Sequence, residues 1–226
     1  MSRFARFATA LVALAVLATP ALAQENWPNR PLKIVHGFPA GAGTDIVARL
    51  LADPLGKVLG QVVVVEPRSG AGGNVGSEYV AKGPADGYTL YLGTADTHAI
   101  NVSLYKTLPF DVQKDFAPIT ILGDVPNVLV LNKGFAPKSL PDFLAYARAN
   151  PGKVNYGSSG NGTSMHLSGE QFKAFAKVDL THIPYRGSPP VTTDLLAGQL
   201  QAAFYQVPTL LGQIRSEEHT SELQSH

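Results

Sequence analysis

Short apolar segments alternate with amphipathic segments along most of this chain. Residues 32–36 (LKIVH), 62–65 (VVVV) and 89–92 (TLYL) are compact and apolar, and the four valines predict a strand buried on both faces. Between these segments, residues 45–59 place apolar side chains at helical spacing, and a further helix is expected at residues 74–81. Strands that alternate with helices predict a parallel α/β sheet.

The first helix, at residues 45–59, carries signals at its start and in its interior. Thr44 or Asp45 could cap its N-terminus, because a short polar side chain there accepts a hydrogen bond from an unpaired backbone N–H. Pro54 removes a backbone donor from the middle of the pattern. We therefore expect Pro54 to kink or divide this helix.

A second unit with the same alternation begins near Asp115. The segment 105–115 (YKTLPFDVQKD) is polar and contains a proline, which is typical of a connection between units. We therefore expect two α/β lobes, lobe 1 at residues 24–112 and lobe 2 at residues 113–214. The strands expected in lobe 2 are residues 119–122, 128–131, 155–156, 181–185 and 200–205, and the helices are residues 139–149, 163–176 and 191–196.

Three glycine-rich turns with almost no charge follow expected strands and precede expected helices. They are residues 38–45 (FPAGAGTD), 68–76 (RSGAGGNVG) and 157–166 (GSSGNGTSMH). A helix N-terminus offers unpaired backbone N–H groups and a partial positive charge, and glycine lets a ligand approach them. Ligands of open α/β sheets bind beyond the carboxyl ends of the strands. The turns therefore predict a crevice between the lobes that binds an anion, most simply a carboxylate.

The two ends of the chain differ from this pattern. Residues 1–23 carry two arginines, a short apolar core and small residues before the boundary, which is typical of a secretory signal peptide cleaved after Ala23. The core is too short to span about 30 Å of hydrocarbon, so we expect export rather than anchoring. Residues 215–226 (RSEEHTSELQSH) lack apolar periodicity and are typical of a disordered tail. They also resemble a translated sequencing adapter, and we expect such a non-native tail, with the natural sequence interrupted near Ile214.

The composition narrows the classes of partner and chemistry. The chain has 18 Lys and Arg, 17 Asp and Glu and a formal net charge of +1, without a basic stripe, so we expect no nucleic-acid partner. Cysteine is absent, which excludes disulfides, thiolate catalysis and cysteine metal sites. An apolar fraction of 45% permits a core that needs no disulfides. We expect no metal ion and no cofactor.

Five segments carry a resemblance to a known family. They are residues 27–45 (WPNRPLKIVHGFPAGAGTD), 65–76 (VEPRSGAGGNVG), 85–94 (ADGYTLYLGT), 155–172 (NYGSSGNGTSMHLSGEQF) and 183–201 (IPYRGSPPVTTDLLAGQLQ). In order and spacing they resemble the Bug-type solute receptors of tripartite tricarboxylate transporters. The resemblance covers nearly all of residues 27–214.

This resemblance implies a two-lobed periplasmic receptor of type II-like, Venus-flytrap architecture that closes on a small organic acid by a hinge. Family ligands include di- and tricarboxylates, aromatic acids and some amino acids, and the partner is the membrane permease. Family members are longer, which implies that lobe 2 is incomplete and that the return to lobe 1 is missing. Matched motif by motif, the resemblance implies ligand contacts at Phe38, Pro39, Ala40, Gly41, Asp45, Gly72, Asn74, Thr94, His98, Ser158, Gly160, Asn161, Gly162, Thr163, His166, Tyr185, Arg186 and Gly187.

Several of these residues also have a purely structural interpretation. Asp45 could serve only as a helix cap, and a carboxylate there would repel an anionic ligand unless water or a distal hydroxyl intervenes. His166 could be a packed, hydrogen-bonded histidine, and His98 is more readily explained as structural. Arg186 has a forked donor set that suits a carboxylate, but it could equally be a surface arginine. The turn at residues 157–166 is the strongest candidate, because its hydroxyl groups lie beside unpaired backbone N–H groups.

We therefore expect a periplasmic receptor, not an enzyme, that captures a small carboxylate between two lobes and delivers it to a membrane permease. One alternative is a secreted α/β hydrolase, which would need a nucleophile elbow of the form G-x-S-x-G. No serine here has that context, since residues 157–160 (GSSG) lack the spacing, and HExxH and Walker A signatures are absent. A surface adhesion module and a non-functional truncated fragment are further alternatives.

Overall fold

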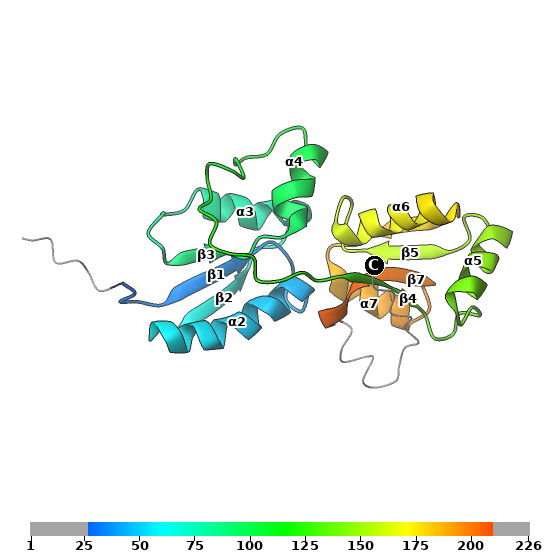
Figure 1. Ribbon diagram of the computed structural model, residues 1–226, viewed down its shortest axis with the longest axis horizontal. Coiled ribbons are helices and arrows are strands. Elements are labelled where there is room, and N and C mark those ends of the chain that lie inside the picture. The colour runs from blue at the N-terminus through cyan, green and yellow to red at the C-terminus, as the bar shows by residue number, and fades with distance from the viewer. Residues whose placement is uncertain (1–26, 210–226) are drawn as a thin grey trace, which may run out of the picture.

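The computed structural model describes residues 27–209, which form two α/β lobes joined by an extended segment (Figure 1). The two-lobed α/β architecture expected from the sequence is confirmed. The predicted signal peptide and the predicted non-native tail lie outside the described residues. Within residues 27–209, no helix has both the length and the apolar character needed to cross a membrane.

Lobe 1 is built on a three-stranded parallel sheet with strand order β2-β1-β3. In the central strand, Ile34 pairs with Val65 on one side and Leu90 on the other, and its side chain packs against Ala48 and Ala52. The strands are β1 (Leu32–His36), β2 (Val63–Pro67) and β3 (Thr89–Tyr91). The helices are α2 (Gly43–Leu59), α3 (Asn74–Ala81) and α4 (Asn101–Leu104), with a 3₁₀ turn η1 (Ala71–Gly73) and a π-helical turn η2 (Asp96–Ile100).

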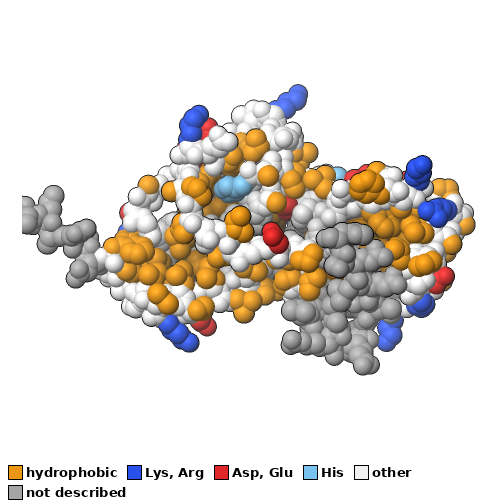
Figure 2. All heavy atoms as spheres, in the orientation of Figure 1, with side chains coloured by type: hydrophobic (Ala, Val, Ile, Leu, Met, Phe, Trp, Pro, Cys, Tyr) orange, Lys and Arg blue, Asp and Glu red, His pale blue; other side chains and the backbone are white. Residues whose placement is uncertain are grey.

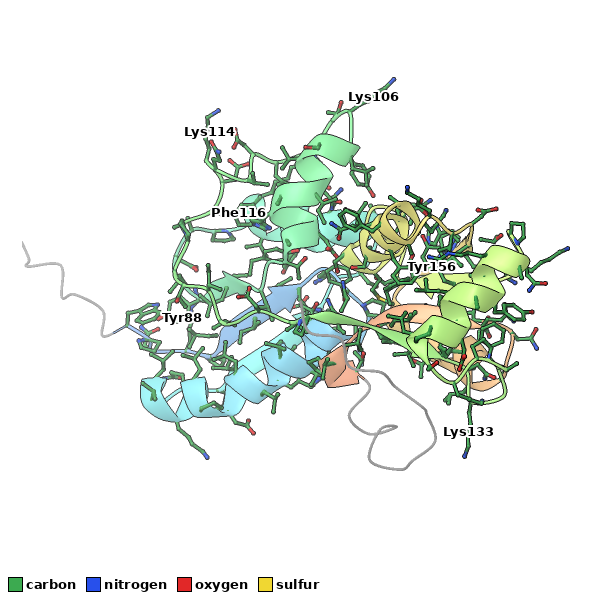
Figure 3. All side chains as sticks on the ribbon, turned by 45° about the vertical axis from the view of Figure 1, so that its right-hand side comes forward. Tyr88, Lys106, Lys114, Phe116, Lys133 and Tyr156 are labelled. Atoms are coloured by element: carbon green, nitrogen blue, oxygen red, sulfur yellow. The ribbon has the colours of Figure 1, made fainter. Side chains whose placement is uncertain are left out.

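Lobe 2 is built on a four-stranded sheet with order β4-β7-β5-β6, in which only β4 is antiparallel to its neighbour. Its core contains the fully buried side chains of Phe143, Tyr156 and Tyr205 (Tyr156 is labelled in Figure 3). The strands are β4 (Asn127–Leu131), β5 (Asn155–Ser158), β6 (Thr181–Pro184) and β7 (Ala202–Gln206). The helices are α5 (Leu140–Ala149), α6 (Ser164–Ala176) and α7 (Ser188–Leu196).

The expected strand of four valines forms, but it is not buried on both faces. Val62 is 64% exposed and Val64 is 47% exposed, while Val63 and Val65 pack against the core of lobe 1. The reason is that β2 lies at the edge of the described sheet, where α2 covers one face only. Figure 2 shows other hydrophobic side chains spread over lobe 1, whereas Lys and Arg lie mainly at the outer margins of that face.

Helix α2 differs from expectation at its start and in its interior. It runs without a break past Pro54, because Pro54 lies on the exposed side, where the carbonyl that loses its donor belongs to the 70% exposed Leu50. The N-cap residue is Ala42, which makes no side-chain capping bond, so neither Thr44 nor Asp45 is the cap.

The connection between the lobes is longer than the predicted segment 105–115. Residues 105–126 contain no strand or helix, so the strand expected at residues 119–122 is absent. Ile119 and Ile121 are 79% and 85% exposed, because no neighbouring strand in the described chain pairs with them. Phe116 packs against Tyr91 and His98 of lobe 1, with ring centroids 5.7 Å and 4.8 Å apart (Figure 3).

Candidate functional site

The carboxyl ends of strands from both sheets meet where the lobes face each other. A cavity that is partly open to solvent lies at this junction. Its walls come from the segments that follow β1, β3, β5 and β6, and from the end of β7. The residues that line it are Phe38, Ala42, Thr44, Thr94, Asp96, Ser159, Met165, Ser188 and Gln206.

Glycines bring the two lobes into close contact around this cavity. A Cβ atom added to Gly187 of lobe 2 would lie 2.6 Å from Cγ of Pro39 in lobe 1, which no side chain can accommodate without movement. The same close approach occurs between Gly43 and Gln206 and between Gly162 and Leu104. The lobes are therefore closed upon each other in this structure.

Three helices present their N-termini at this junction, and none of them has a capping hydrogen bond from the side chain of its own N-cap residue. They are α2 from lobe 1 and α6 and α7 from lobe 2, and Ala42, Met165 and Ser188 at their first turns line the cavity. Each N-terminus offers backbone N–H donors and the positive end of the helix dipole. The junction is therefore suited to an anion or to the negative end of a polar ligand.

One of these N-termini is occupied by a side chain from the opposite lobe. Oδ1 of Asp96 in lobe 1 accepts a hydrogen bond from the backbone N–H of Ser164, the first residue of α6, at 2.9 Å. Asp96 is 5% exposed, and burial raises the pKa of its carboxyl group although the bonds from Ser164 act in the opposite direction. The pair links the lobes at the edge of the cavity.

In the first glycine turn, the carboxylate of Asp45 is held by groups of lobe 1. It accepts hydrogen bonds from Gly41 N at 3.0 Å and Arg49 Nε at 2.9 Å, and Nε2 of the fully buried His36 lies 3.1 Å away. Burial alone would raise the pKa of Asp45, but these donors outweigh it and lower the pKa. Burial lowers the pKa of His36, so a neutral imidazole that donates from Nε2 fits this site. Asp45 stabilises the turn through these hydrogen bonds, and it does not line the cavity.

The rest of the first turn forms the lobe 1 wall. Phe38 lines the cavity, and Pro39 contacts Gly187 across the junction. Ala40 and Gly41 are exposed at the tip of the turn. Ligand contact at these four residues stays a prediction.

The second glycine turn lies beside the site rather than in its wall. Nδ2 of Asn101 donates to Gly72 O at 3.0 Å and to Oδ1 of the buried Asn74 at 2.8 Å. Neither Gly72 nor Asn74 lines the cavity. Through Asn101 these two residues are hydrogen-bonded to the segment after β3. Asn101 directly follows η2, and η2 contains Asp96.

The loop after β3 is fixed by a compact set of hydrogen bonds. Thr94 N donates to Thr97 Oγ1 at 3.0 Å, and Thr97 N donates to Thr94 Oγ1 at 3.3 Å. His98 Nδ1 lies 2.9 Å from Thr97 Oγ1, and its ring packs on Tyr91 and Phe116. Burial lowers the pKa of His98. Of the two residues predicted here, Thr94 lines the cavity and His98 packs behind it.

In the third glycine turn, most predicted side chains bond within lobe 2. Ser158 is fully buried, and its Oγ lies 2.7 Å from His182 Nε2. Thr163 Oγ1 donates to Gly160 O at 2.8 Å. The next residue after Ser158, Ser159, lines the cavity instead.

His166 also bonds within this turn, in line with its structural interpretation. Its Nδ1 accepts a hydrogen bond from Gly162 N at 3.0 Å, and its ring stacks on His182 with centroids 4.0 Å apart. Burial lowers the pKa of His166. Asn161 is exposed at the tip of the turn.

The three predicted contacts after β6 lie in different places: one bonds within lobe 2, one is exposed, and one lies at the junction of the lobes. Tyr185 donates from its hydroxyl to Asp194 Oδ2 at 2.6 Å, and burial together with this carboxylate raises the pKa of Tyr185 to about 12. Arg186 is exposed and does not line the cavity. Gly187 lies at the junction against Pro39.

Sequence reasoning missed most of the cavity wall. Ala42, Thr44 and Ser159 lie inside the quoted turns but were passed over in favour of their neighbours. Asp96, between the predicted Thr94 and His98, had a signal, because an acid in the loop that follows a strand lies at the edge where ligands bind. The remaining missed residues are Met165, Ser188 and Gln206. Among the described residues, no group of three or more His, Cys, Asp or Glu side chains is placed to hold a metal ion.

Comparison with known proteins identifies the family. Residues 47–221 match the family described as tripartite tricarboxylate transporter family receptor. The chain belongs to this receptor family. Among curated proteins, it is 39% identical to Protein BugT of Bordetella pertussis over 217 residues, which cover 96% of this chain and 66% of BugT. The family consists of solute receptors rather than enzymes.

Solved structures of family members have the same fold. Rpa4515 of R. palustris, solved with adipate, superposes with a TM-score of 0.84 at 38% identity, over 87% of this chain and 66% of that chain. MatC from Rhodopseudomonas palustris, solved with bound malate, gives 0.78 at 32% identity, over 86% and 66%. The periplasmic binding protein BugD gives 0.80 at 34% identity, over 86% and 65%.

The chain is shorter than these relatives. It spans 66% of BugT and 56% and 61% of two further curated proteins, from Pseudomonas sp. and Agrobacterium vitis. The family and the two-lobed fold follow from the matched part.

Proposed function

We propose that this protein is a periplasmic receptor that binds a small organic carboxylate between its two lobes and presents it to the membrane permease of a tripartite tricarboxylate-type transporter. The observation that carries the proposal is the cavity at the junction of the lobes, which is walled by the N-termini of α2, α6 and α7, with Asp96 bonded to that of α6. Family relatives solved with adipate and with malate support a carboxylate ligand. The secretory signal predicted at residues 1–23 and the periplasmic relative BugD support the location.

The geometry favours a mechanism of capture and closure. In an open state, the acid would meet the N-terminus of α2 on lobe 1, where Ala42 and Thr44 line the cavity. Lobe 2 would then close, bringing Ser159 and Ser188 over the ligand. Backbone N–H groups and hydroxyls replace the water around the carboxylate. The permease would recognise the closed state, which a ligand favours only as far as it binds that state more tightly than the open one.

A thermal-shift screen of the purified protein against small mono-, di- and tricarboxylates tests this function. A ligand at about 100 times its Kd adds about 2.7 kcal/mol, which corresponds to a rise in Tm of about 5–10 °C for a chain of this size. The variant Ser159→Phe fills the cavity and should abolish the shift. Ser103→Phe places the same side chain at an exposed position of α4 and should keep it. A screen in which no acid raises Tm would overturn the proposal.

A further inference from the structure

The cavity contains one ionisable side chain, and that side chain is an acid. Of the nine described residues that line it, only Asp96 can carry a charge, and none is Lys, Arg or His. The nearest predicted cationic contact, Arg186, is exposed and lies outside the wall. A ligand in the closed cavity is therefore surrounded by neutral groups and one carboxyl group.

Asp96 also removes one of the three anion-binding positions. The N-terminus of α6 would be a natural place for a ligand carboxylate, but its first N–H, from Ser164, already donates to Asp96 Oδ1 at 2.9 Å. The N-termini of α2 and α7 then remain for the ligand, and both are lined by neutral residues, Thr44 and Ser188 among them. Among the described lining residues there is no cationic side chain to balance the charge of a second ligand carboxylate.

A carboxylate can accept more hydrogen bonds than Asp96 receives from Ser164. Its two oxygens have about four acceptor sites, whereas Ser164 supplies the backbone N–H and a side-chain interaction. A buried acceptor that lines a cavity favours a ligand group that can donate to it. An ammonium or hydroxyl group meets this requirement, and a second carboxylate does not.

We propose that Asp96 determines the specificity of the receptor, selecting a small acid with one carboxylate and one hydrogen-bond donor, such as an amino or hydroxy acid, over a dicarboxylate. This inference rests on the proposed receptor function. The carboxylate end lies at the helix N-termini of α2 and α7, and the donor end faces Asp96. A dicarboxylate would place two like charges in one small cavity without a cation, which disfavours its binding.

Two matched ligand series test the selection directly. Butyrate, 4-hydroxybutyrate, 4-aminobutyrate and succinate share four carbons and differ only in the distal group. Hexanoate, 6-hydroxyhexanoate, 6-aminohexanoate and adipate repeat the series with six carbons. Calorimetric titration of the wild-type protein at neutral pH should show the hydroxy or amino acid of at least one series binding at least tenfold more tightly than the diacid of that series.

The variant Asp96→Asn separates the role of the charge from that of the shape. It should tighten binding of the diacid at least tenfold and weaken binding of the amino acid by a similar factor. Binding of a hydroxy acid should weaken less than binding of an amino acid, because a hydroxyl donor carries no charge. The variant therefore distinguishes hydroxy acids from amino acids. Asp124→Asn changes an exposed acid in the segment between the lobes and should leave the order of affinities unchanged.

The outcomes separate this inference from the function on which it rests. Wild-type protein that binds the diacids as tightly as the amino and hydroxy acids overturns the inference and leaves the receptor function intact. So does an unchanged order of affinities in Asp96→Asn. Should that variant fail to fold, the wild-type order decides alone. Wild-type protein that binds no carboxylate at all overturns both proposals.

Discussion

At the scale of single residues, Asp45 shows how a buried carboxylate can build a binding turn without touching the ligand. Replacing it by Asn removes the charge that organises Gly41 N, Arg49 and His36. We expect Asp45→Asn to lower the free energy of unfolding by about 2 kcal/mol, because a buried donor on His36 loses its charged acceptor. Urea unfolding measures this loss. Asp53→Asn, at an exposed position of the same helix, should change the free energy of unfolding by less than about 0.5 kcal/mol.

The same carboxylate predicts a defined dependence of stability on pH. The pKa of Asp45 in the folded protein lies below its unfolded value of about 3.9, because its donors outweigh burial. Its contribution is therefore present above that value and is lost as the pH falls through the folded pKa. The difference in unfolding free energy between wild type and Asp45→Asn should stay constant in the neutral range and shrink in acid. A difference that grew as the pH fell below about 4 would contradict this account.

Residue identity in a turn predicts the chemistry of a site better than it predicts the direction of each side chain. Ser158 and Ser159 are equivalent on sequence grounds, yet Ser158 bonds to His182 inside lobe 2 and Ser159 lines the cavity. β5 ends at Ser158, which is fully buried, whereas Ser159 belongs to the turn that follows the strand. Phe38 and Thr94, which were predicted, line the cavity, whereas Gln206 comes from a strand with no glycine signal.

At the scale of secondary structure elements, α5 shows a start signal that is readable in the sequence and present in the structure. Ser139 Oγ accepts a hydrogen bond from Asp142 N at 3.3 Å, and the two side chains are 2.7 Å apart. We expect Ser139→Ala to cost about 1 kcal/mol of unfolding free energy, the usual loss for an N-cap. Chemical denaturation followed by circular dichroism measures it. The matched variant Ser103→Ala changes an exposed serine without a capping role, and an equal loss in both variants would refute the capping role.

Hydrophobic periodicity predicts where a strand or helix forms, but it does not predict which neighbouring elements pair with it or cover it. The valines of β2 and the apolar residues 119–122 have the same local pattern of a buried strand. In the structure β2 pairs with β1 and is covered on one face, while residues 119–122 have no partner strand within residues 27–209. Strand order and the distance between segments along the chain decide this, and neither is encoded in the local alternation of apolar and polar residues.

At the scale of the whole molecule, the two lobes approach each other closely at glycines. Gly187 meets Pro39 and Gly162 meets Leu104, and the hydrogen bond between Asp96 and Ser164 crosses the same junction. Because glycine has no side chain, these contacts let the backbones of the two lobes come close together. A ligand in the cavity favours this closed arrangement by as much as it binds it more tightly than an open one.

The glycine at this junction gives a test of closure itself. Gly187→Ala places a Cβ atom against Pro39, so we expect it to hold the lobes apart and to weaken ligand binding at least tenfold. Gly198→Ala is the matched control, because Gly198 also has a positive φ, of 79°, but a Cβ there would meet nothing closer than 3.9 Å. Both variants strain the backbone and should lower Tm, so the deciding measurements are the Kd and the radius of gyration by small-angle scattering with ligand bound. If Gly187→Ala bound ligand as tightly as Gly198→Ala and became equally compact, close contact at this junction would not be required for binding.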